Sequence, residues 1–100
     1  MKKRIVLKRK NKNLLSIENY PMVEILWQDI ESNSAWQSFK ELDNSKLPIC
    51  CTKGHLYSQK NGITRVFGDY SKDDDNNINE IGNTTIIPTS VIVDIKKLTK

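Results

Sequence analysis

The fold is decided by residues 51–70, CTKGHLYSQKNGITRVFGDY. Two β-prone runs flank the dipeptide Asn61-Gly62, a strong signal for a β-hairpin because both residues accept the positive φ of a two-residue turn. The turn sets the register, since each step away from it pairs one residue from each strand. The predicted pairs are Lys60 with Ile63, Tyr57 with Val66, Leu56 with Phe67, and Gly54 with Asp69.

Both strands of this hairpin contain a glycine, Gly54 in the first and Gly68 in the second. Glycine inside a strand marks a bend or a bulge at which a sheet can coil. The predicted register also puts large side chains on both faces, with Leu56 and Phe67 on one and His55, Tyr57, Val66 and Tyr70 on the other. We therefore expect a small curled sheet that is covered on its outside by a helix or a partner subunit.

The residues before the hairpin predict a strand and a short helix. Apolar side chains alternate through residues 23–29, which is typical of a strand with one buried face. Ser34 and Gln37 match a capping box, and residues 43–45 end the helix. Its narrow apolar stripe is Trp36, Phe39 and Leu42. A helix of two turns is not stable alone, so we expect it to lean on the sheet.

The residues after the hairpin predict a loop and a last strand. Residues 71–85 are polar and are expected to form a long loop, either a lid or a disordered segment. Residues 86–98 are rich in β-branched side chains and predict a strand, with a helix as the alternative. Pro88 cannot donate to a central ladder, so it precedes this strand or lies on a sheet edge.

The predicted fold class is mainly β with one short helix. Sequential antiparallel strands bent at glycines indicate a small SH3-like or Sm-like barrel, partly open, in residues 22–100. The alternative is an open α+β sheet with the helix on one face. Residues 1–21 are interpreted as a basic N-terminal extension, mobile or loosely docked.

The positive charge of the chain is concentrated in that extension. Residues 1–12 have seven basic side chains and no acidic ones, while residues 13–100 sum to −3. The arm could grip nucleic acid or an acidic partner, or it could be a solubilising tail, or an extension upstream of a start at Met22. The candidate nucleic-acid contacts are Lys2, Lys3, Arg4, Lys8, Arg9, Lys10 and Lys12.

Several classes of protein do not fit the sequence. No apolar run has the length of a membrane span or the pattern of a signal peptide, so a cytoplasmic protein is expected. Adjacent Cys50 and Cys51 make a strained disulfide, and with His55 they fall short of a zinc ligand set. One histidine and no nucleophile elbow make an enzyme a weak hypothesis, so neither catalysis nor a cofactor or metal is predicted.

Binding has more support than catalysis in the residue types. Aromatic side chains are large for so small a domain, and they can stack on bases while a nearby cation meets a phosphate. The competing interpretation is that both tryptophans pack in the core. The candidate ligand-binding residues are Trp27, Asp29, Trp36, Lys53, His55, Tyr57 and Arg65.

Four short motifs resemble a group of short phage proteins of unassigned role. The motifs are the W-x-D of residues 27–29, Trp36, the G-x-L of residues 54–56 and the I-P-x-x-x-I-x-x-I-x-x-L of residues 87–98. The resemblance covers residues 22–98, and Thr89 stands where the group often has Lys. It implies an accessory protein of a phage or prophage in the host cytoplasm. Small phage proteins of this kind often block host defence, some by sequestering nucleotide messengers as oligomers.

Three functions follow as hypotheses. The first is a non-enzymatic, homo-oligomeric binder that sequesters a nucleotide-derived signal of host immunity. The second is a nucleic-acid-binding module that uses the basic arm. The third is a protein-binding inhibitor of a host enzyme that uses a sheet edge or the Trp36 helix.

Overall fold

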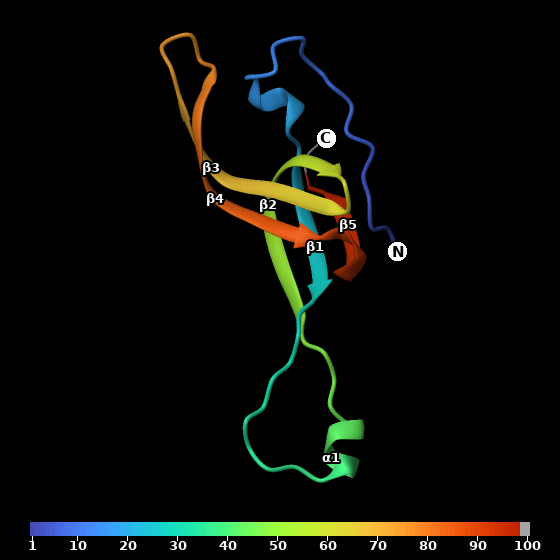
Figure 1. Ribbon diagram of the computed structural model, residues 1–100. Coiled ribbons are helices and arrows are strands. Elements are labelled where there is room, and N and C mark those ends of the chain that lie inside the picture. Colours follow the sequence, from blue (N-terminus) through green and yellow to red (C-terminus); the bar gives the residue numbers. More distant parts are fainter. Residues whose placement is uncertain (99–100) are drawn as a thin grey trace.

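The computed structural model describes residues 1–98 and is mainly β (Figure 1). One antiparallel sheet has the strand order β4-β3-β2-β1-β5. Its strands are β1 (Met22–Gln28), β2 (Ile49–Lys60), β3 (Ile63–Lys72), β4 (Ile78–Pro88) and β5 (Ile92–Lys97). The helix α1 (Phe39–Asp43) and the 3-10 turns η1 (Ile17–Asn19) and η2 (Thr89–Val91) complete the described chain.

The central hairpin forms where the sequence predicts it, but its register shifts after three pairs. Asn61 and Gly62 have φ values of 55° and 74°, and Lys60 lies opposite Ile63, as predicted. A β-bulge at Tyr57 then puts Leu56 opposite Val66, whereas the sequence predicts Tyr57 at that place. The predicted pairing beyond the bulge is wrong because a bulge adds one unpaired residue to one strand only.

The bulge assembles the core, because it brings Leu56 and Val66 to the same face. All five strands contribute to one buried cluster, and the sheet must curl for its two edge strands to meet there. The two edge strands do not pair with each other, so the sheet is not closed into a barrel. The cluster consists of Val23 and Ile25 from β1, Leu56 from β2, Val66 from β3, Ile87 from β4, and Ile92 and Ile95 from β5.

The opposite face of the sheet carries an aromatic cluster. Phe67 is buried there, and the His55 ring stacks on it with the ring centroids 5.2 Å apart. Tyr20 and Tyr70 meet the Phe67 ring edge-on at 5.7 and 6.4 Å. Leu14, Leu15 and Tyr20 lie beside Phe67, so the second half of the N-terminal segment covers this face, whereas Ile5 packs against the core cluster.

The long polar loop predicted for residues 71–85 is a hairpin instead. β3 continues to Lys72 and β4 begins at Ile78, with a turn between them in which the Asp73 carboxylate accepts from the N–H groups of Asp75 and Asn77 at 2.9 Å. The prediction fails because this hairpin projects beyond the core, so its strands need no apolar face (Figure 1). Pro88 ends β4 on a sheet edge, as predicted, and η2 interrupts the single last strand that the sequence indicates.

The short helix lies further along the chain than predicted, and within the described residues 1–98 all of its side chains are exposed. Ser38, and not Ser34, caps it, through a capping box with Glu41. The helix ends at Asp43, as predicted, but it does not lean on the sheet, because residues 29–48 carry it away from the sheet (Figure 1). Trp36 and Phe39 are exposed, so the core role considered for Trp36 is also wrong.

Glycine at position 54 is required by packing. A Cβ there would lie 3.1 Å from the Phe67 carbonyl oxygen and 3.3 Å from the Val66 Cβ. We expect Gly54→Ala to lower the free energy of unfolding by about 1–3 kcal/mol, the usual cost of overpacking. Urea denaturation measures this loss.

Gly82→Ala is the matched control, because its Cβ would come no closer than 4.0 Å to the Asp69 Cβ. We expect it to keep or slightly raise the stability, since alanine loses less backbone entropy than glycine on folding. If both substitutions changed the free energy of unfolding equally, close packing at Gly54 would not be the cause of the stability loss there.

Candidate functional site

The N-terminal arm, residues 1–21, lies along the sheet and is held there by the side chain of Gln59. The Gln59 Oε1 accepts from the Ile5 N–H at 2.9 Å, and its Nε2 donates to the Lys3 carbonyl at 2.9 Å. Nε2 also donates to Thr64 Oγ1 at 2.9 Å, and Thr64 is buried and bonded to Thr89. One amide on β2 therefore joins the arm to the hairpin and to η2.

The second half of the arm folds around the buried side chain of Asn19. Its Oδ1 accepts from the N–H groups of Lys10 and Asn11 at 2.9 and 2.8 Å, and its Nδ2 donates to the Asn13 carbonyl. Tyr20 closes this loop by donating its hydroxyl to the Leu14 carbonyl at 2.6 Å. The loop is thus fixed by its own hydrogen bonds directly before β1 begins.

Residues 7–10 run between two pockets, and their side chains alternate between them. Lys8 and Lys10 line one pocket, while Leu7 and Arg9 line the other. This is the alternation of an extended chain, in which successive side chains point to opposite sides. The basic run therefore supplies cations to both sides of the arm.

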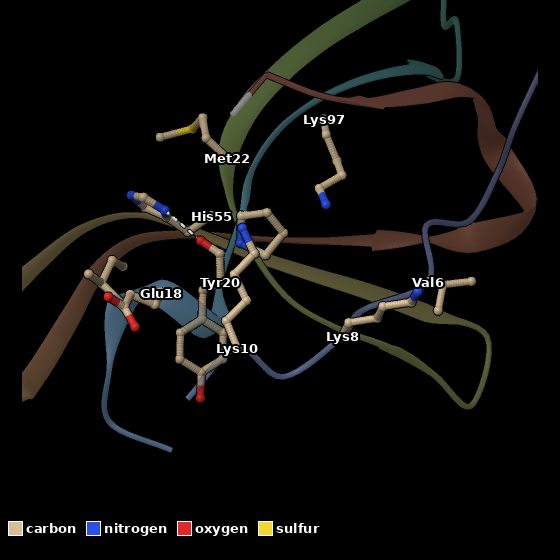
Figure 2. Close-up of a pocket in the computed structure, with 10 residues that line it drawn as sticks. Val6, Lys8, Lys10, Glu18, Tyr20, Met22, His55 and Lys97 are labelled. Atoms are coloured by element: carbon tan, nitrogen blue, oxygen red, sulfur yellow. Dashed lines mark hydrogen bonds between the residues drawn. The ribbon is translucent and has the colours of Figure 1, made fainter. Parts of the chain in front are cut away.

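The first pocket, which we call the arm pocket, has a volume of about 440 Å³ and lies between the arm and the sheet (Figure 2). Lys8 and Lys10 come from the arm and Lys97 from β5, at the other end of the chain. Figure 2 shows Lys97 and Lys10 reaching into it from opposite sides. Its remaining lining residues are Val6, Ile17, Glu18, Tyr20, Pro21, Met22 and His55.

The arm pocket combines positive charge with an apolar surface. Its lining contains three lysines and one carboxylate, that of Glu18, which accepts a hydrogen bond from Asn11 Nδ2 at 3.2 Å. His55 donates from Nδ1 to the Tyr20 carbonyl at 3.0 Å, because that oxygen can only accept. Cations gathered in a concave surface raise the local positive potential, so the arrangement attracts an anion that also has an apolar part.

The second pocket, with a volume of about 470 Å³, lies on the other side of the arm. Arg9 and Lys60 line it together with Tyr20 and Tyr57, whose rings stack with their centroids 5.8 Å apart. Among the described residues no group forms a hydrogen bond with the buried Oγ of Ser58, which also lines it. The second pocket thus has two cations in place of three but no carboxylate to offset them, so its net charge equals that of the arm pocket, and it includes no residue from β5.

The seven predicted ligand-binding residues do not form one site. His55 lines the arm pocket and Tyr57 the second pocket. Trp27 is half-buried and donates to Thr52 Oγ1 at 2.9 Å, and Lys53 lies 3.8 Å from the carboxylate of Glu24. The other three lie apart: Asp29 begins the projecting segment, Trp36 is exposed on it, and Arg65 lies on β3 opposite Ile86.

The seven predicted nucleic-acid contacts fall into two groups of three, with Lys12 left over. Three hold the arm in place: the Lys2 N–H bonds Asp94, the Lys3 ammonium donates to the Ser90 carbonyl, and Arg4 donates to the Gln59 carbonyl. Lys8, Arg9 and Lys10 line the two pockets, and Lys12 is exposed.

Sequence reasoning misses Lys97 and Tyr20 as site residues. The one signal in the sequence is that an extended chain would point Lys8 and Lys10 to one side and Leu7 and Arg9 to the other. This pattern does not indicate which strand the arm covers.

No group of three His, Cys, Asp or Glu side chains that could hold a metal occurs within residues 1–98, and both cysteines are free thiols. No helix in the same residues has the length and apolar character needed to cross a membrane. Comparison with protein-family models, with curated proteins and with solved structures gives no match. The geometry of the pockets is therefore the main indication of function.

Removing the amide of Gln59 should release the arm. We expect Gln59→Ala to speed tryptic cleavage in residues 1–12 by about tenfold or more, since each lost hydrogen bond contributes about 1 kcal/mol. Limited proteolysis followed by mass spectrometry measures the rate. Gln28→Ala, at the exposed end of β1, is the control and should cleave like the wild type. Unchanged cleavage of Gln59→Ala would mean that other contacts hold the arm.

The pKa of Tyr20 should make stability fall in alkaline solution. Burial, and next the neighbouring Tyr57, raise this pKa above its usual value of 10.0, against a smaller opposing effect of Arg9. The folded state thus favours the neutral phenol, so its contribution is complete below pH 10 and is lost as the pH rises through the raised pKa.

Urea denaturation between pH 8 and pH 11, about the range that brackets a phenol pKa, measures this contribution. Tyr20→Phe should cost about 1 kcal/mol at pH 8, from the lost hydrogen bond to the Leu14 carbonyl. The difference between the two proteins should shrink as the pH rises. A constant difference would show that Tyr20 does not titrate with unfolding.

Proposed function

We propose that the chain binds a small phosphate-bearing, nucleotide-like anion in the arm pocket and sequesters it without catalysis. The observation that carries the proposal is the convergence of three lysines from the two ends of the chain, Lys8 and Lys10 from the arm and Lys97 from β5, on one cavity. Lysine ammonium groups bind phosphate as point charges, and several around one cavity suit a group with more than one negative charge.

The rest of the lining supports a ligand larger than a free phosphate ion. Val6, Ile17, Pro21 and Met22 give the pocket an apolar surface, and Tyr20 adds an aromatic ring. A base or ribose can bury apolar area against such a surface while its phosphate meets the lysines. A volume of about 440 Å³ lies within the usual range of small-molecule sites, about 300–1,000 Å³.

A protein that only sequesters a ligand needs affinity for it and no catalytic group. The His55 and Glu18 side chains agree with this, since both form hydrogen bonds within the protein. One ring nitrogen of His55 bonds the Tyr20 carbonyl, and Glu18 bonds Asn11. Both side chains thus support the pocket walls. The proposal requires no cofactor or metal.

The proposal also includes an SH3-like fold and a role as a phage accessory protein. The strand order, the η2 turn between β4 and β5, and the curl that brings both edge strands to one core support an SH3-like arrangement of the open sheet. The role as a phage accessory protein in the host cytoplasm, directed against an immune signal, rests on the sequence resemblance of residues 22–98.

Calorimetric titration and thermal shift against adenine and guanine nucleotides, cyclic dinucleotides and cyclic ADP-ribose isomers test the proposal. One compound should raise the melting temperature by several degrees, because a ligand that binds only the folded state stabilises it by RT ln(1 + [L]/Kd). Lys8→Ala with Lys97→Ala should weaken that binding by about tenfold or more, since hydrogen bonds to charged groups contribute about 1.5–3 kcal/mol each.

Lys40→Ala is the control for charge, since Lys40 is exposed on α1 and outside the pocket. It should leave binding unchanged. No stabilisation by any compound in the panel would overturn the proposal. Binding of single-stranded DNA or RNA that grows with strand length and falls steeply with salt would favour the nucleic-acid module, in which all the cations of the arm take part.

A further inference from the structure

The segment between β1 and β2, residues 29–48, forms a lobe that stands apart from the sheet (Figure 1). Its base is closed by the Asp29 N–H, which donates to the Pro48 carbonyl at 3.0 Å. Residues 30–47 are all exposed, including every residue of α1. The lobe therefore gains nothing from the core of its own chain.

The apolar side chains of residues 30–47 in the lobe are all exposed in the part of the chain that the structure describes. Trp36 is fully exposed, and Phe39 and Ile30 keep 87% and 79% of their surface in water, while Leu42 and Leu47 keep more than half. Scattered apolar residues are normal on a surface, but five in one projecting segment indicate an interaction site. A helix of five residues also needs tertiary contacts to be stable, yet among residues 1–98 none of its residues is buried.

The charge of the lobe identifies what covers it. The lobe has four carboxylates and two lysines, a net charge of −2, whereas the rest of the chain carries +6. The arm at the other side of the molecule is the most basic part of the sequence, and it too exposes apolar side chains, at Val6, Leu14 and Leu15. Opposite charge steers such surfaces together, and like charge would repel two lobes or two arms.

We propose that a second copy of this chain covers the lobe, with its basic arm region as the receiving surface. The molecule is elongated, about 60 × 25 × 23 Å, so two copies side by side in opposite directions bring each lobe to the arm region of the other. The pairing is reciprocal and closes as a twofold dimer, whereas the same contact made head to tail would propagate.

The surface that two copies could bury between them is large enough for a stable dimer. Aromatic side chains bury about 150–250 Å² each, so Trp36 and Phe39 with three aliphatic neighbours remove several hundred Å² per lobe. Two lobes and the two surfaces that receive them then exceed the total of about 1,200 Å² at which stable interfaces begin.

Sedimentation velocity of the full chain tests the pairing, at about 1–100 μM, a range suited to the weaker interfaces of this size. We expect a dimer that weakens as salt is raised. Trp36→Ala with Phe39→Ala should weaken self-association about a hundredfold, as loss of central aromatic anchors does, and should leave the circular dichroism of the sheet unchanged. Gln37→Ala, a polar residue of the same lobe, is the matched control and should dimerise like the wild type.

Charge reversals test which surface receives the lobe. Glu31→Lys with Asp43→Lys on the lobe, and Lys2→Glu with Lys12→Glu on the arm, should each weaken the dimer about tenfold or more. Asp74→Lys with Asp75→Lys, in the turn between β3 and β4, adds positive charge beside the arm, where Ile78 N–H donates to the Leu15 carbonyl, and should not weaken the dimer. A monomer at every concentration would overturn the proposal, as would a dimer unaffected by the lobe variants, and an assembly larger than two would overturn the reciprocal pairing.

Discussion

The extra residue that Tyr57 adds to β2 determines how the two faces of the sheet are used. Without it, the side chains of Leu56 and Val66 would point to opposite faces, because one step along a strand reverses the direction of a side chain. With it, these two residues join the core, and His55 and Phe67 pair on the opposite face. The core and the aromatic cluster on the opposite face thus depend on the same local irregularity.

The arm pocket is a second consequence of that arrangement. The aromatic face created by His55 and Phe67 is covered by Tyr20, which fixes where the arm approaches β1. Gln59, two residues beyond the bulge, then holds the start of the arm. The pocket walls are therefore built mainly from the arm, which has no regular structure over most of its length, with one residue each from β1, β2 and β5.

The sequence predicts the positions of the strands better than their register or the contacts between distant segments. Asn61-Gly62 locates the hairpin and alternation locates β1, because both signals are local. The bulge at Tyr57 has no signature of its own and becomes visible only through the packing of Leu56. The β3–β4 hairpin is missed because polar residues can form a strand when neither face must be buried. Of the candidate site, the lysines of the arm are identified by charge, but Lys97 is not, since tertiary structure brings it to the arm.

The position of Lys97 has a consequence for when the site exists. The arm pocket joins the first tenth of the sequence to its last strand, so it cannot be complete while the chain is still on the ribosome with β5 inside the exit tunnel. The N-terminal part of a nascent chain emerges first and folds with what is available. The arm therefore has an incomplete pocket until β5 has been made and has joined the sheet. A chain that lacks β5 would lack Lys97, and with it one of the three cations of the arm pocket.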